Sequence, residues 1–162
     1  MKITVKKYNA YDISKMREIW NEVVHDANAF PQIETLKDED EAKAFFDSQS
    51  YCGVAQNDDG KILGMYILHP NNVGRCSHIS NASFAVAKES RGLHIGEKLV
   101  VDCLENAKKL GFKIMQFNAV VSDNVHARHL YERLGFNLLG TVEDGFNGVD
   151  GYKDICLYYK TL

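Results

Sequence analysis

The stretch Lys88–Val100, with the sequence KESRGLHIGEKLV, joins a strand-like segment to a helical one. Before it, SHISNASFAVA has the composition of a mostly apolar strand. After it, apolar residues recur at helical spacing from Ile95 to Leu110, and Gly111 is expected to end the helix. A strand that leads directly into a long amphipathic helix is typical of α/β folds, so this junction restricts the chain to that class.

The remaining segments alternate between the same two periodicities. Strand patterns cover residues 2–8, 51–56, 61–70, 77–87, 113–121, 136–142 and 152–160, and helical patterns cover 13–24, 38–47, 95–110 and 125–134. Asp12 is expected to cap the first helix. No linker, repeat or low-complexity segment interrupts this order, so residues 1–162 are predicted to form a single α/β domain with a mixed sheet and helices on both faces.

Composition narrows the partners and the location. Hydrophobic residues make up 45% and charged residues 25% of the chain, and the net charge is −3, which argues against a nucleic-acid partner. No apolar run is long enough to span a membrane, and the N-terminus lacks the apolar core of a signal peptide. The four cysteines show no paired spacing and are expected to be reduced core thiols, which favours a cytoplasmic protein without membrane association.

Glycines at the strand-to-helix junction suggest a phosphate site. A glycine-rich turn that opens a helix presents free backbone amides and the positive end of the helix dipole, and Gly92 and Gly96 would not block a ligand. Arg91 would add positive charge. Glycines that only permit tight helix–strand packing are the alternative explanation.

A second motif gives the glycines a family context. The segment SDNVHARHLYERLGF, with RGLHIG upstream, resembles the GNAT family of acyl-CoA-dependent N-acetyltransferases. Asn124, Ala127, Tyr131, Gly135 and Phe136 match its later motif. Arg91 and Gly96 match its glycine motif, but His94 replaces the first glycine. The resemblance covers nearly the whole chain and implies a mixed, mostly antiparallel sheet with a bulged strand that opens an acyl-CoA cleft.

The resemblance also implies residue roles for the acetyl-CoA cosubstrate. The pyrophosphate would rest on the amides of Arg91, Gly92, Leu93, His94, Ile95, Gly96 and Glu97. The pantetheine would pair with Phe84, Ala85 and Val86 and bond to Asn124, while the Val86 amide would polarise the thioester carbonyl. Tyr131 would protonate the leaving thiolate, although its pattern alone would equally fit a core aromatic residue.

A narrower resemblance concerns the acceptor. The segments CSHISNASFAV, FNAVVSDN and ANAFPQ are similar to the subgroup that acetylates azetidine-2-carboxylate and related small cyclic amino acids. It implies a substrate pocket of Asn81, Phe84, Asn118 and Phe30. Asn81 and Phe84 are three residues apart and would face opposite sides of a regular strand, so a β-bulge is predicted between Asn81 and Val86. The alternative is that each asparagine bonds to neighbouring backbone.

Several choices remain open at this level. A protein or peptide N-acetyltransferase and a non-catalytic acyl-CoA-binding module are the alternative functions. No glutamate precedes Val86 on its strand, so no side chain there can act as a base. A water relay is expected to remove the amine proton, in preference to the more distant His78. His126 and His129 have no further ligand nearby in the sequence, and no metal is expected. Because many family members dimerise, the resemblance allows a homodimer.

Overall fold

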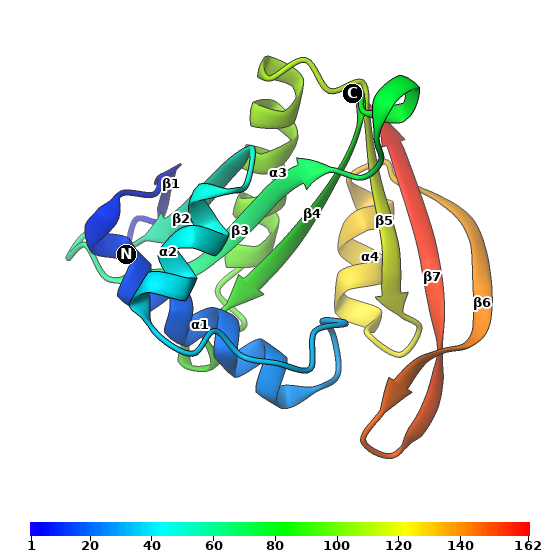
Figure 1. Ribbon diagram of the computed structural model, residues 1–162, viewed down its shortest axis with the longest axis horizontal. Coiled ribbons are helices and arrows are strands. Elements are labelled where there is room, and N and C mark those ends of the chain that lie inside the picture. Colours follow the sequence, from blue (N-terminus) through cyan, green and yellow to red (C-terminus); the bar gives the residue numbers. More distant parts are fainter.

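The computed structural model describes residues 1–162 and contains one seven-stranded sheet (Figure 1). The strand order is β1-β2-β3-β4-β5-β7-β6, and only β4 and β5 run parallel. The strands are β1 (Thr4–Lys7), β2 (Tyr51–Gln56), β3 (Ile62–Pro70), β4 (Ile79–Val86), β5 (Ile114–Val121), β6 (Asn137–Gly148) and β7 (Gly151–Thr161). The helices are α1 (Ile13–Asp26), α2 (Glu39–Asp47), α3 (Ile95–Lys109) and α4 (Val125–Arg133). This confirms the predicted class and element order.

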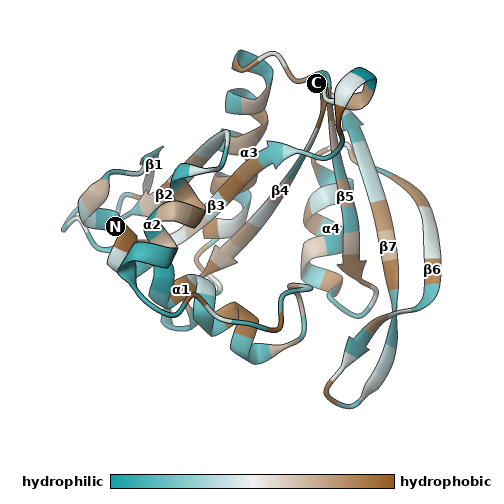
Figure 2. Cartoon of the chain, in the orientation of Figure 1, coloured by the Kyte–Doolittle hydropathy of each residue, from teal (hydrophilic) through white to brown (hydrophobic).

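The helices cover the two faces of the sheet. On the α1 face, α1 and α2 bury Trp20, Phe46 and Met65 in one core cluster. On the α3 face, α3 and α4 enclose a second cluster that contains Leu99, Phe117 and, at its border, Leu130. Figure 2 shows brown, hydrophobic segments on the central strands of the sheet and on α1. The sheet therefore has a core on each face, as the sequence predicts.

Side chains along β4 alternate between these two faces. Ala82, Phe84 and Val86 contribute to the cluster on the α3 face, whereas Ala85 belongs to the cluster on the α1 face. Asn81 shares the parity of Ala85 and therefore lies on the α1 face. Apart from the buried Ser80, the residues of β4 that face α3 are apolar, whereas Asn81 and Ser83 face α1.

The β-bulge predicted between Asn81 and Val86 is absent. The β3–β4 register runs without a break from the Gly64–Val86 pair to the Pro70–Ser80 pair. The irregularity lies instead in β5, where the register against β7 shifts by one residue between Phe117 and Val120. Continuous pairing with β3 holds β4 regular, while β5 inserts its extra residue next to Asn118.

Strands β4 and β5 form a fork. Their parallel pairing is limited to Ile79 with Ile114 and Ser80 with Met115. Beyond these pairs the two strands diverge toward their C-terminal ends (Figure 1). We call this divergence of 81–86 from 116–121 the fork. It supplies the opening that the sequence prediction assigned to a bulge in β4.

Local signals set the helix ends. Gly111 and Gly135 adopt positive φ angles of 93° and 89°, and the following residues, Phe112 and Phe136, close the last turns through their amides. Asp12 precedes α1, but its side chain does not cap the helix. Its carboxylate instead accepts the Asn9 amide and the Lys6 ammonium group, which corrects the predicted cap.

Cysteine burial agrees with the sequence prediction at three positions. Cys52, Cys103 and Cys156 are buried free thiols. Cys76 is exposed on a short 3₁₀ turn between β3 and β4, so its predicted place in the core is wrong. No helix is sufficiently long and apolar to cross a membrane.

Candidate active site

A run of free amides lies at the start of α3. The backbone N–H groups from Gly92 to Glu97 donate to no acceptor within the protein, and the first helical bond is from Lys98 to the His94 carbonyl. Gly92 and His94 have positive φ angles of 83° and 57°, which fold the turn back on itself. Free amides at a helix N-terminus attract anions, so this amide turn, residues 92–97, fits a phosphate group.

The space around the amide turn is also suitable. A Cβ atom built on Gly96 would meet only Leu130 Cδ2, at 3.9 Å, so the turn is open at this point. Glu97 pairs with Arg133 at 2.8 Å, which offsets the negative charge that a carboxylate would place beside a bound phosphate. The turn is therefore open at Gly96, and the carboxylate of Glu97 is paired.

Arg91 was expected to contribute its amide and its charge to the phosphate site, but both are engaged elsewhere in the protein. Its amide donates to the Lys88 carbonyl at 3.4 Å, and its guanidinium contacts Asp26 at the end of α1, at 3.3 Å. Lys88 and then Arg91 lower the pKa of the Asp26 carboxyl. Arg91 therefore ties the segment before the amide turn to α1, and the free amides begin one residue later, at Gly92.

The backbone explains the histidine at position 94. His94 is the N-cap residue of α3 and has a left-handed conformation, and its side chain is exposed. Glycine adopts this conformation freely, and histidine, asparagine and aspartate are enriched there among other residues. His94 can thus replace the family's glycine while its amide stays in the turn.

One edge of β4 is free inside the fork. The Ala87 amide donates to the Leu63 carbonyl and the Asn71 amide donates to the Ile79 carbonyl, which fixes the alternation of the β3–β4 ladder. By this alternation Ala85 bonds to β3, whereas Phe84 and Val86 direct their backbone groups toward the fork. Phe84 and Val86 can therefore pair with an extended pantetheine arm, and Ala85 cannot.

Tyr131 lies on α4 beside the fork. Its ring packs against Phe117 of β5 at 4.5 Å, Phe136 at 5.6 Å and Tyr158 at 6.0 Å between centroids. Its hydroxyl forms no hydrogen bond within the protein and is not sealed from solvent. Burial, and secondarily Cys103, raises the pKa of Tyr131 well above its usual value, so the phenol stays protonated and able to donate.

Asn124 holds the start of α4. Its side-chain oxygen accepts the Ala127 amide at 3.4 Å, which makes it the N-cap of the helix that carries Tyr131. The side-chain NH₂ group has no partner in the protein and remains available for the predicted bond to pantetheine.

Four amide side chains meet at the base of the fork, on the α1 face. The NH₂ groups of Asn81 and Asn118 both donate to Oδ1 of Asn71, at 3.1 and 2.5 Å. Gln116 donates to Oδ1 of Asn118 at 3.1 Å. We call these four residues the asparagine cluster. The structure thus brings Asn81 and Asn118 together through side chains, and the alternative in which each bonds to neighbouring backbone is wrong.

Asn71 and Gln116 are the two members that the sequence interpretation missed, and Asn71 is the one that accepts both NH₂ groups. Asn71 follows β3 in the loop to β4, where a single asparagine gives no periodic signal. The adjacent pair Asn71–Asn72 reads as a loop, and only the pairing of β3 with β4 places Asn71 beside Asn81.

The two aromatic residues of the predicted pocket lie elsewhere. Phe84 is on the α3 face, 5.9 Å from both Tyr66 and Phe117, because the regular strand places it opposite Asn81. Phe30 is only 7% exposed and packs on Trp20 at 4.5 Å in the core of the α1 face. Neither ring joins the asparagine cluster, which corrects the predicted pocket.

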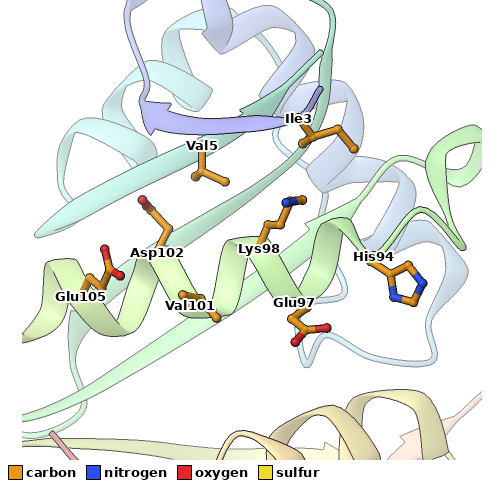
Figure 3. Close-up of a pocket in the computed structure, with 8 residues that line it drawn as sticks. All are labelled: Ile3, Val5, His94, Glu97, Lys98, Val101, Asp102 and Glu105. Atoms are coloured by element: carbon orange, nitrogen blue, oxygen red, sulfur yellow. The ribbon is translucent and has the colours of Figure 1, made fainter. Parts of the chain in front are cut away.

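One groove lies outside the fork. It has a volume of about 480 Å³ and lies between edge strand β1 and helix α3 (Figure 3). Its lining includes Glu97, Asp102 and Glu105 with one lysine, Lys98, and this acidic character disfavours a polyphosphate. Strands β2 and β3 separate β1 from the fork, and neither Tyr131 nor the asparagine cluster reaches this groove.

Histidines form no metal centre. His126 and His129 are exposed on α4, and no group of three or more potential ligands occurs in the structure. His78 is exposed just before β4.

Comparisons with known proteins agree with this geometry. Residues 15–136 match the model of the Acetyltransferase (GNAT) family. N-acetyltransferase aca1 of Schizosaccharomyces pombe is 38% identical over 99 residues, which are 60% of this chain and 47% of that protein. The chain thus matches about half the length of this curated relative.

Solved structures share the fold over the full chain. A GCN5-related N-acetyltransferase from Kribbella flavida is 29% identical, with a TM-score of 0.90 over 99% of this chain and 98% of the other. A GNAT superfamily phosphinothricin acetyltransferase from Sinorhizobium meliloti, solved in complex with AcCoA, is 22% identical, with a TM-score of 0.91 over 100% and 89%. The chain belongs to the GNAT family of acetyltransferases, which confirms the predicted family.

Proposed function

We propose that this chain transfers the acetyl group of acetyl-CoA directly to the amine of a small acceptor that carries a carboxylate. A cyclic amino acid such as azetidine-2-carboxylate is the proposed type. The observation that carries the proposal is the convergence of two NH₂ groups, from Asn81 and Asn118, on a single oxygen atom at the base of the fork.

Acetyl-CoA, the acetyl donor, would bind between the amide turn and the fork. Coenzyme A would place its pyrophosphate on the amide turn and its pantetheine along Phe84 and Val86, whose backbone groups are free. The Val86 amide lies five residues, about 16 Å, along β4 from Asn81, so it would bond to the pantetheine rather than polarise the thioester carbonyl. The thioester would then lie nearer the base of the fork, past Phe84. The NH₂ group of Asn124 would bond to the pantetheine from the α4 side.

The acceptor half uses the asparagine cluster. The Asn71 oxygen that receives both NH₂ groups lies where a carboxylate oxygen of a ligand would be bound. Hydrogen bonds to a charged group contribute about 1.5–3 kcal/mol each, more than the neutral amide–amide bonds that they would replace. A carboxylate would therefore displace Asn71 with a gain in binding energy.

Direct transfer needs no covalent enzyme intermediate. Holding the amine against the thioester turns a bimolecular step into an effectively unimolecular one. The amine nitrogen bonds to the carbonyl carbon, the carbon–sulfur bond breaks, and the Tyr131 hydroxyl gives its proton to the leaving thiolate. The raised pKa of Tyr131 keeps this proton in place at neutral pH.

A substrate panel tests the proposal. Thiol release from acetyl-CoA is measured with cyclic and linear amino acids, with matched amines that lack the carboxylate, and with short peptides, and products are identified by mass spectrometry. Acetylation of amino acids well above the matched amines supports the proposal. Acetylation of peptides alone, or CoA binding without any turnover, would contradict it. The cytoplasmic location and the homodimer stay predictions.

A further inference from the structure

Acetyl transfer to an amine releases a proton that the site must accept. The attacking nitrogen loses one hydrogen when it becomes an amide nitrogen, and Tyr131 is already assigned as a donor. Strand β4 carries no carboxylate on the α1 face. His78 is exposed before β4 and shares the parity of Ala82, which lies on the opposite, α3 face.

A different histidine lies next to the asparagine cluster. His69, near the end of β3, is the direct cross-strand partner of Asn81. Met65 and Ile67 of the same strand belong to the core of the α1 face, so His69, two residues further on, has its side chain on that face too. Directly opposite residues in an antiparallel pair have Cα atoms about 4.5–5.5 Å apart, so the imidazole is a neighbour of the Asn81 amide.

Its hydrogen bonding determines which ring nitrogen is free. His69 Nδ1 lies 2.9 Å from the Pro70 carbonyl oxygen, which can only accept a hydrogen bond. Nδ1 must therefore carry the hydrogen, and in the neutral ring Nε2 holds the lone pair. Nε2 has no partner in the protein, and His69 forms no ion pair.

The surroundings leave this lone pair available. The ring is half-buried, and its neighbour across β4, Asn81, is uncharged. On the other side, Ser50 precedes β2 and donates its amide to the Leu68 carbonyl, and its hydroxyl does not titrate near neutral pH. His69 forms no salt bridge with a carboxylate, so its Nε2 lone pair is not engaged within the protein.

We propose that His69 is the general base of the reaction, with Nε2 accepting the proton of the attacking amine directly or through one water molecule. The nitrogen–carbon bond forms as the amine proton passes to Nε2, and the carbon–sulfur bond breaks as the Tyr131 proton passes to sulfur. The imidazolium then loses its proton to solvent, from which Tyr131 is reprotonated. This inference rests on the proposed function, because it requires the amine to lie at the asparagine cluster.

The test compares His69→Gln with His78→Gln, a histidine on the other face. With azetidine-2-carboxylate and acetyl-CoA at neutral pH, His69→Gln should lower kcat about 10²-fold, the usual contribution of a positioned base, and leave the KM of acetyl-CoA unchanged. The deficit should shrink as pH rises, because more of the amine is then free without help. His78→Gln should behave as the unchanged protein. Equal effects of the two variants, or a pH-independent loss, would overturn the proposal.

Two further outcomes separate this inference from the proposed function. If no amino acid is acetylated by the unchanged protein, the proposed function is wrong and the role of His69 falls with it. If amino acids are acetylated and His69→Gln retains full kcat, only the role of His69 is wrong. Nitrogen-15 NMR of the free protein should show the Nδ1–H tautomer of His69, and the Nε2–H tautomer would overturn the proposal independently of any substrate.

Discussion

Asn81 and Asn118 lie on strands that do not pair at their level, yet both donate to the same oxygen atom, Oδ1 of Asn71. Two ladders make this possible. The regular pairing of β4 with β3 directs Asn81 to the α1 face, and the irregularity in β5 follows Phe117, next to Asn118. The two donors therefore approach one point at the base of the fork, beside the proposed path of the thioester.

Tyr131→Phe tests acid catalysis. The substitution removes the hydroxyl and keeps the ring contacts with Phe117 and Phe136. We expect kcat to fall about 10²-fold, with the dissociation constant of acetyl-CoA unchanged in calorimetry. Because burial raises the pKa of Tyr131, deprotonation of this residue should not reduce the rate of the unchanged protein up to about pH 10. Full activity of the variant would make Tyr131 a core residue only.

Gly96→Asp tests the amide turn. The new carboxylate would place a negative charge among the amides of residues 92–97, where the pyrophosphate is expected. Coenzyme A affinity should fall by more than about 10²-fold, while the far-ultraviolet circular dichroism stays that of the folded protein. Gly140→Asp on β6, which also has open space, is the matched control. Unchanged affinity in folded Gly96→Asp would place the pyrophosphate elsewhere.

His94→Gly tests whether the histidine ring has a role in binding. Glycine adopts the observed φ of 57° without strain, and the amide that faces the ligand is retained. We expect unchanged coenzyme A affinity and no loss of thermal stability. His94→Val, a β-branched residue in the same conformation, should lose about 1–3 kcal/mol of stability. A clear loss of coenzyme A affinity in His94→Gly would show that the ring itself contacts the cofactor.

The sequence predicts those features that depend on local periodicity. Gly111 and Gly135 end their helices as expected, and the apolar spacing from Ile95 to Cys103 identifies the buried side of α3. The amide turn is also local, because glycines and a helix start define it. Arg91 shows the limit of this reasoning, since its partner Asp26 is 65 residues away in the sequence.

The position of the site residues depends on how β3 pairs with β4 and β5 with β7, which cannot be read from the sequence of one strand alone. A bulge was expected in β4 because Asn81 and Phe84 were both assigned to one pocket, but β4 stays regular and the irregularity lies in β5. Asn71 and His69 are placed by the register of β3 against β4, which the hairpin sequence does not specify. Phe30 lies in a segment without periodicity, and only the packing on Trp20 shows that it is buried.

The most direct test of the account is the preference of the protein for azetidine-2-carboxylate over azetidine, measured as a ratio of kcat/KM. If Asn81 and Asn118 bind the carboxylate, the ratio should be at least about 10² in the unchanged protein. It should fall close to one in the Asn81→Ala/Asn118→Ala variant and stay high in Asn147→Ala, a control on an exposed asparagine of β6. A high ratio that survives loss of both asparagines, or a ratio near one in the unchanged protein, would contradict the account.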